Sequence, residues 1–523
     1  MLPTIKPKWT LIFLLSAKNN LFFEQLNVIK EIYSVGSTDS VKLVIILDGL
    51  SGDKFSDILE RPSIFSPRKN SDFLTDTHIY ILERTKSTLA NKKDLKELLN
   101  YIIENFEAEN YGFFYKGHGG PGETDLAKGI FDTKLEYIDP KLDDDEIETK
   151  FKNSQHGWTL EGYCEYPSIQ INKQNKKPVL LVFSKKNTAS LSYYGLATVL
   201  KDVFKGNIGF CCLDCCWAQQ IENAYNFKGV ADYFIASADE MPVLGIGYAQ
   251  LCSQFINRPS ISAEEAANLI VAINFNKNYA DYDSEIAEFR NMGVSISSIN
   301  LKEYDTFQKS FTTLCTFLAA KLEKKDKYIY SILDAARGNC SDYTYKDTDN
   351  LTIDEIDYPM FNIDLIWLME NLLYYNVNDK LDILIYDIIY QLKNNIITSC
   401  LSSNYKRSVM GNRGLGGKGI SICFPKNRLF ARRSILFSKE MEFYKVTGWK
   451  DVLVNYYSYK NGKKNSRQRQ KSSPELEIVS KFLPPADQKV STMPGDNERL
   501  VFVSTTKKDV LKKKQEKRAK ALS

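Results

Sequence analysis

Histidine and cysteine are both scarce in this chain, which has 3 histidines and 10 cysteines among 523 residues. That cysteine density is far below the density of small domains stapled by disulfides. Several of the cysteines are also adjacent pairs, which bridge poorly. The cysteines therefore indicate a reducing compartment rather than a disulfide framework. Any chemistry that needs an imidazole must use His78, His118 or His156.

Long apolar runs and a strong net charge are missing too. No run approaches the ~18–20 apolar residues that span a bilayer, so we expect no transmembrane segment. The formal net charge is +4, and we do not expect the whole chain to bind nucleic acid. Basic residues concentrate in KKDVLKKKQEKRAKALS (507–523). We expect a solvated tail there, with contact to an anionic partner as the alternative.

The first apolar run, TLIFLLSA (10–17), resembles the core of a signal peptide. It is followed by Lys18, Asn19 and Asn20 without a small-residue cleavage site, which favours a buried strand. We therefore expect a cytoplasmic protein, or one exported without a clear signal peptide. Sec-type secretion is the less favoured alternative, and the compartment itself is left open.

The first 260 residues alternate short apolar runs with helical patterns. The runs are rich in Ile, Val, Phe and Tyr, and they cover 9–17, 41–49, 78–83, 111–117, 207–214 and 230–238. Each is too short for a core helix and is typical of a strand buried on both faces. We predict an α/β fold with a mainly parallel sheet covered by helices. In such folds the functional residues follow the carboxyl ends of the strands.

Composition divides the chain further. About 90 residues separate the fourth and fifth predicted strands, far more than a crossover needs, so we expect an inserted excursion. A capping box, SAEE (262–265), opens a mainly helical stretch. We predict a core over 1–260, with the excursion at about 120–190, followed by a helical region over 261–405. A returning strand and helix over 406–460 should complete the core, and a polar, weakly ordered tail should cover 461–523.

Four cysteines, Cys211, Cys212, Cys215 and Cys216, lie within six positions of the fifth run. A zinc site needs four convergent ligands, but side chains alternate between the two faces of a strand. No second CxxC occurs elsewhere, so we predict no metal site. We interpret Cys211, Cys212 and Cys215 as small buried residues. Thiol redox chemistry or metal storage is a further alternative.

Cys216 has a different setting, because it follows the buried strand and we expect the helix WAQQIENAYNF to begin directly after it. A helix N-terminus stabilises a thiolate. His118 follows the fourth run and precedes Gly119, where backbone can approach a substrate closely. The two strand ends should meet at one edge of the sheet, so we predict His118 as base and Cys216 as nucleophile. His78 begins a predicted strand and His156 lies in the excursion, so neither has this placement.

An ordered set of motifs resembles the clostripain-like cysteine peptidases, whose clan also holds the caspases, gingipains and legumain. The set includes WTLIFLLSAKNNL, HGG, LSYYGLATVLKD, IGFCCLDCC, ADYFIASADEMP and GKGISICFP, and the likeness covers residues 9–457. It implies a caspase-like αβα sandwich and a cysteine endopeptidase that acts on proteins or peptides. This sequence departs from the family pattern at Cys215, which replaces the usual Ala, at Pro121 in the glycine-rich stretch, and in its enlarged excursion.

The resemblance also implies roles for individual residues. The backbone N–H groups of Gly119 and Cys216 would form the oxyanion hole. Asp214 matches the acidic residue that shapes the family's S1 pocket, and Asp239 and Glu240 are further S1 candidates. The family prefers Arg or Lys before the scissile bond, a cation that a buried carboxylate would hold.

Many relatives cut themselves between the His and Cys strands, which makes Lys185 and Lys186 candidate cleavage points. Some relatives also depend on Ca²⁺. The sequence itself requires no cofactor, and the acidic run DPKLDDDEIETK (139–150) is interpreted as a solvated face. The alternative function is a catalytically silent caspase-like scaffold that binds protein partners.

Overall fold

In the computed structural model, Met1–Arg469 form one compact unit. The tail predicted from residue 461 lies, from residue 467 on, outside the described residues. Backbone alone is described for 22–23, 128–136, 169–171, 178–189, 279–280 and 460–466. Including these, the structure describes residues 6–16, 22–47, 62–71, 80–82, 89, 91–117, 119, 128–136, 169–171, 178–189, 191–239, 241–242, 244–280, 295–340, 343, 362–402, 417–424 and 442–466.

A nine-stranded sheet organises the described chain, in the order β13-β11-β10-β9-β5-β1-β2-β3-β4. Its centre is parallel and comprises β2 (Val41–Leu47), β1 (Trp9–Leu15), β5 (Asn110–Lys116), β9 (Ile208–Asp214) and β10 (Ala231–Ser237). Antiparallel strands extend both sides, with β3 (Ser63–Phe65) and β4 (Tyr80–Ile81) on one and β11 (Ser295–Asn300) and β13 (Ile397–Ser402) on the other. The predicted α/β fold is confirmed.

Five of the six predicted strands form this parallel centre, and the sixth differs. The run at 78–83 contributes only the two residues of β4, which pair antiparallel with β3 at the end of the strand order. Tyr80 and Ile81 are half-buried, and the Tyr80 hydroxyl donates to Glu97 (2.9 Å). The interpretation of this run as a strand buried on both faces is therefore wrong, because β4 lies at the edge of the sheet and its side chains are only half-buried.

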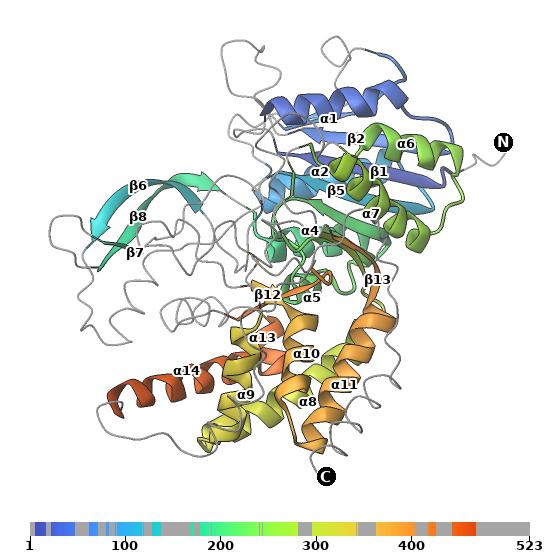
Figure 1. Cartoon of the computed structure of the whole chain (residues 1–523). Coiled ribbons are helices and arrows are strands. Elements are labelled where there is room, and N and C mark those ends of the chain that lie inside the picture. Colours follow the sequence, from blue (N-terminus) through green and yellow to red (C-terminus); the bar gives the residue numbers. More distant parts are fainter. Residues whose placement is uncertain are drawn as a thin grey trace. The chain divides into compact units, whose positions relative to one another are not determined.

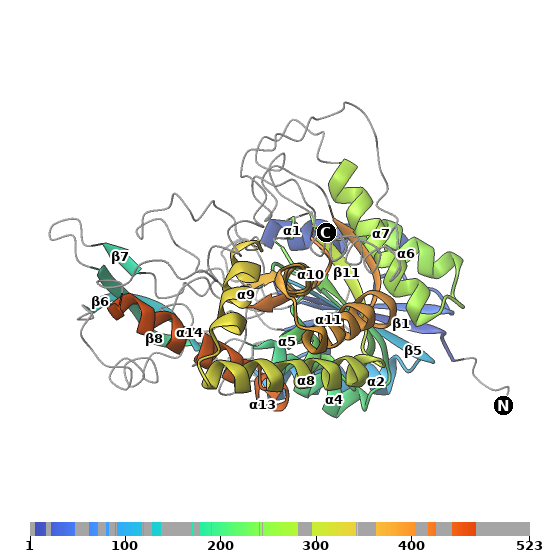
Figure 2. The same cartoon turned by 60° about the horizontal axis from the view of Figure 1, so that its bottom comes forward.

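Helices cover both faces of the parallel centre (Figure 1). On one face, α1 (Phe22–Val35), α6 (Tyr248–Asn257) and α7 (Ala263–Ala280) pack on alternate residues of β1, such as Leu11 and Phe13. On the other lie α2 (Lys92–Asn105), α4 (Tyr193–Phe204) and α5 (Ile221–Phe227), as Figure 2 shows. The capping box of α7 is confirmed, because the Ser262 N–H donates to Glu265 (3.0 Å) and the Glu265 N–H to Ser262 (3.2 Å).

A helical region follows the core. It contains α8 (Tyr304–Glu323), α9 (Lys327–Gly338), α10 (Leu365–Tyr375), α11 (Asp379–Gln391), which runs on as a short π-helix η5 (Leu392–Ile396), α13 (Glu442–Thr447) and α14 (Trp449–Ser466). α8 packs against α11, α13 and α14, while α10 packs against α9. A two-stranded sheet of β12 (Asn362–Asp364) and β14 (Ser421–Cys423) joins it to the core, because the Cys423 N–H donates to Glu222 of α5 (2.9 Å).

A separate three-stranded sheet lies within the predicted excursion. It consists of β6 (Lys128–Glu136), β8 (Pro178–Ala189) and β7 (Ile169–Ile171), with β8 in the middle. The acidic run at 139–150 falls outside the described residues. Across the part of the chain that the structure describes, no helix has the length and apolar character needed to cross a membrane.

Candidate active site

The ends of β5 and β9 bring the two predicted catalytic segments to one edge of the sheet. These strands are parallel neighbours, and Lys116 stands opposite Asp214 at their last positions. Gly119 is buried against Cys215 and Cys216, the two residues that follow β9. A methyl group added to Gly119 would lie 2.6 Å from the Cys215 sulfur and 2.7 Å from the Cys216 carbonyl oxygen. His118 lies outside the described residues. Only a glycine fits this approach of the two loops.

The four clustered cysteines differ in exposure. Cys211, Cys212 and Cys215 are fully buried, and burial raises the pKa of each thiol well above its ordinary value. They therefore stay neutral and unreactive at neutral pH. Cys216 is the one of the four that is partly exposed. Among the described residues, no group of three or more His, Cys, Asp and Glu side chains could hold a metal ion.

The expected helix does not begin at Cys216. α5 begins at Ile221, and Trp217 instead takes a left-handed conformation (φ 52°). The Trp217 N–H donates to the Asp239 carbonyl oxygen (2.9 Å) and the Gln219 N–H to that of Ser237 (2.8 Å). These bonds to the end of β10 hold residues 217–219 in a turn. The prediction of a helix N-terminus at the nucleophile is therefore wrong.

The Cys216 sulfur has a different polar neighbour. It accepts a hydrogen bond from the backbone N–H of Met241 (3.2 Å), and as a thiol it donates one to the carbonyl oxygen of the same residue (3.8 Å). Met241 belongs to the loop between β10 and α6, here named the 241–247 loop, of which residues 241, 242 and 244–247 are described. The shorter bond, from the N–H, favours the thiolate, whereas the longer bond to the carbonyl oxygen can form only with the neutral thiol.

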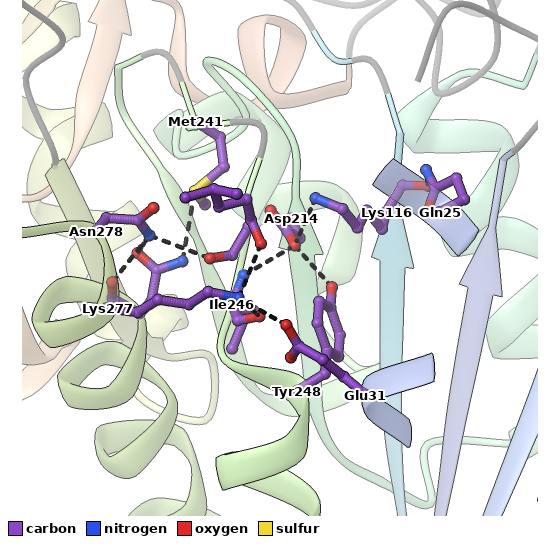
Figure 3. Close-up of polar contacts among 12 residues, drawn as sticks. Gln25, Glu31, Lys116, Asp214, Met241, Ile246, Tyr248, Lys277 and Asn278 are labelled. Atoms are coloured by element: carbon purple, nitrogen blue, oxygen red, sulfur yellow. Dashed lines mark hydrogen bonds and ion pairs between the residues drawn. The ribbon is translucent and has the colours of Figure 1, made fainter. Parts of the chain in front are cut away.

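Asp214 is enclosed, and its side chain is 0% exposed. Its Oδ2 atom lies 3.2 Å from Lys116 Nζ, and it accepts hydrogen bonds from the Tyr248 hydroxyl (2.7 Å) and the Ile246 N–H (3.2 Å), as Figure 3 shows. Burial and then the Asp214 charge raise the pKa of Tyr248 well above its ordinary value. A substrate cation could reach this carboxylate only if its neighbours moved, so the S1 role of Asp214 stays a prediction.

Cys216 also packs against a small cluster that includes an aromatic side chain from the helical region. Trp217, Ala238 and Tyr343 form a small buried cluster, and Cys216 and Trp367 pack against it. Asp239 is next to this cluster in sequence and is 7% exposed. Burial, followed by the charges of Asp364 and Asp239, raises the pKa of Tyr343 well above its ordinary value. Glu240 lies outside the described residues.

Sequence reasoning missed several of these neighbours. A lysine at the end of an otherwise apolar strand, as in NYGFFYK (110–116), could have pointed to Lys116 as a buried partner. Met241 acts through its backbone, which no side-chain pattern reveals. Tyr343 and Trp367 come from a region more than 100 residues later in the chain, and their place in the cluster beside Cys216 depends on tertiary packing.

The candidate cleavage points lie in β8, the middle strand of the three-stranded sheet. Lys185 pairs with Phe131 of β6, and Lys186 pairs with Ile130. Because a peptidase binds its substrate as an extended single strand, β8 would have to leave β6 before it could be cut.

Comparisons with known proteins agree on one family. The sequence profile of the clostripain family matches residues 168–478, which is more than half of the chain and includes Cys216 but not His118. No curated protein matches the chain significantly.

Solved structures with the same fold are distant in sequence. A secreted C11 cysteine protease of Bacteroides thetaiotaomicron, bound to an irreversible peptide inhibitor, is 16% identical with a TM-score of 0.50, over 85% of this chain and 99% of that one. An inactive zymogen C11 protease of Parabacteroides distasonis is 17% identical with a TM-score of 0.51, over 86% and 99%. The B. thetaiotaomicron C11 protease iotapain is 14% identical with a TM-score of 0.52, over 85% and 100%.

These likenesses establish the fold, and the profile match establishes the family that the sequence motifs predicted. The chain belongs to the clostripain family and is a cysteine-type peptidase.

Proposed function

We propose that this peptidase is an endopeptidase in which Cys216 is the nucleophile and His118 the general base. The observation that carries the proposal is the packing of Gly119 against Cys215 and Cys216. His118 precedes Gly119 directly in the sequence, which supports its assignment as the base. The partial exposure of Cys216 beside three buried thiols supports the same choice.

The chemistry then proceeds in two steps. His118 takes the proton of the Cys216 thiol, and the resulting thiolate attacks the substrate carbonyl carbon while the N–H groups of Gly119 and Cys216 stabilise the oxyanion. The C–N bond breaks as His118 gives its proton to the leaving amine, which leaves a thioester on Cys216. Water, deprotonated by His118, attacks the thioester carbon and releases the acid and the free thiol. No third residue is assigned to orient the histidine.

We further propose cleavage after Arg or Lys. The acidic candidates for the S1 pocket are Asp214, Asp239 and Glu240, and a carboxylate of low exposure would select a cation. Asp239 follows a cluster that packs on Cys216, which supports its inclusion. Lys116 already balances the charge of Asp214, so we expect Asp239 to contribute the larger share of the preference.

Self-processing at Lys185 or Lys186 is part of the proposal, and so is a requirement for Ca²⁺, on which some relatives depend. Both positions are in the segment between the His and Cys strands. Full activity in a chain that mass spectrometry shows to be uncut would contradict the proposed self-processing.

The test is hydrolysis of matched fluorogenic peptides that end in Arg, Lys, Asp or Leu, with and without Ca²⁺. The wild type is compared with Cys216→Ala, and Cys215→Ala is the matched control. We expect release from Arg and Lys peptides that Cys216→Ala abolishes and Cys215→Ala retains. Cleavage after Leu or Asp would reject the acidic S1 pocket. If the wild type hydrolyses none of these peptides, even after proteolytic cleavage between residues 120 and 190, the alternative function of a binding scaffold would be favoured.

A further inference from the structure

The 241–247 loop is in contact with the nucleophile on one side and with Asp214 on the other. Its Met241 N–H donates to the Cys216 sulfur (3.2 Å), and its Ile246 N–H donates to Asp214 Oδ2 (3.2 Å). A shift of this loop would therefore remove the donor from the sulfur. What holds the loop in place bears directly on the reactivity of Cys216.

Side chains from the last turns of α7 hold it. Lys277 Nζ donates to the carbonyl oxygens of Leu244 (3.2 Å) and Ile246 (3.5 Å), and Asn278 Nδ2 donates to that of Gly245 (3.1 Å), as Figure 3 shows. Three consecutive loop carbonyls thus accept hydrogen bonds from two neighbouring residues of one helix. Loop carbonyls on a protein surface commonly bond to water instead, which would leave the loop free to move.

Both donors are themselves fixed. Asn278 is 5% exposed, and its Nδ2 also donates to the Asn274 carbonyl oxygen (2.9 Å). Lys277 Nζ forms an ion pair with Glu31 of α1 (3.0 Å). The other carboxylate oxygen of Glu31 accepts the N–H of Ala249, just after the loop (3.1 Å). The loop is therefore tied to two helices, α7 and α1.

The backbone path of the loop leaves little room for an alternative. Gly245 has φ +60°, and a methyl group added to it would lie 2.2 Å from Asp214 Oδ2 and 2.4 Å from Lys116 Nζ. The chain passes directly over the buried ion pair, where only glycine fits. Asn278 binds the carbonyl oxygen of this same residue.

We propose that Lys277 and Asn278 are positioning residues for the peptidase reaction. By binding the carbonyl oxygens of residues 244–246, they keep the Met241 N–H on the sulfur of Cys216 and so maintain its thiolate. This inference rests on the proposed role of Cys216 as nucleophile. Both residues act through the loop, whose carbonyl oxygens they bind.

The experiment compares Asn278→Leu with Asn276→Leu, a matched control because Asn276 is exposed on the same helix. Alkylation of Cys216 by iodoacetamide is followed against pH by mass spectrometry, alongside kcat and KM. For Asn278→Leu we expect the alkylation midpoint to move up by about one pH unit. We expect kcat to fall about 5- to 30-fold, the effect of losing one or two hydrogen bonds, with KM nearly unchanged.

Lys277 gives a second test at a position that is only partly buried. Lys277→Met should shift the alkylation midpoint in the same direction. Lys277→Arg keeps the N–H donors and should therefore keep the wild-type midpoint. An alkylation profile that both Asn278→Leu and Lys277→Met leave at the wild-type midpoint would overturn the proposal, whatever happens to kcat. Alkylation needs no substrate, so this test does not depend on peptide cleavage. A wild type that cleaves no peptide would contradict the proposed function, and the alkylation profiles would still test the positioning role of Lys277 and Asn278.

Discussion

The buried ion pair between Lys116 and Asp214 gives the sharpest stability prediction. Its side chains are 5% and 0% exposed, and the two charged atoms are 3.2 Å apart. Replacing Lys116 by Met removes the ammonium group and leaves the carboxylate buried. Its remaining donors are the Tyr248 hydroxyl and the Ile246 N–H. Breaking one partner of a buried pair costs about 3–5 kcal/mol, because the other charge is left uncompensated.

The matched control is the surface pair of Lys96 and Asp202, with a similar distance (3.1 Å) and side chains 46% and 54% exposed. Lys96→Met should lower the free energy of unfolding by no more than about 1 kcal/mol. Urea denaturation followed by tryptophan fluorescence measures both variants. The double variant Lys116→Met/Asp214→Asn should recover much of the loss, because it no longer buries a charge.

Two outcomes would refute this reasoning. One is a Lys116→Met variant that loses no more stability than Lys96→Met, which would mean that Lys116 does not compensate a buried charge. The other is a double variant less stable than Lys116→Met alone. In that case the carboxylate would stabilise the fold through Tyr248 and Ile246 rather than through its cation.

Three further predictions concern other residues. Burial raises the pKa of Glu222 from 4.5 to about 7, so the contribution of this group to stability is full below pH 4.5 and falls by about 3 kcal/mol up to pH 7. Glu222→Gln should therefore stabilise at pH 8 but not at pH 4.5 in urea denaturation, and an equal gain at both pH values would contradict this. Gly119→Ala should lower kcat/KM by at least about tenfold in peptide hydrolysis, because its methyl would clash with Cys216; unchanged kcat/KM would exclude the close approach. Asp239→Asn should reduce the ratio of Arg to Leu cleavage more than Asp214→Asn does, and the reverse order would make Asp214 the main S1 residue.

The parallel centre of the fold was predictable because its signal is local. Leu11 and Phe13, for example, belong to a run that is buried on both faces, and such runs contain few polar residues. The capping box at Ser262 was predictable for the same reason, since it depends on residues three positions apart.

The turn after Cys216 was not predictable from local propensity. WAQQIENAYNF contains good helix formers, yet Trp217 and Gln219 donate their N–H groups to the end of β10 instead. Tertiary hydrogen bonds thus override the helical preference of the first four residues. The site could not be predicted for the same reason, because Met241 contacts Cys216, and Tyr343 joins the cluster beside it, only through packing between distant segments.

The central claim is that Cys216, rather than its neighbour Cys215, is the nucleophile. The most direct measurement is covalent labelling with a peptidyl acyloxymethyl ketone that ends in Arg, followed by mass spectrometry of the digested protein. The account predicts one adduct, on Cys216, that forms equally in Cys215→Ala and disappears in Cys216→Ala together with peptide hydrolysis. An adduct on Cys215, or hydrolysis that persists in Cys216→Ala, would contradict it.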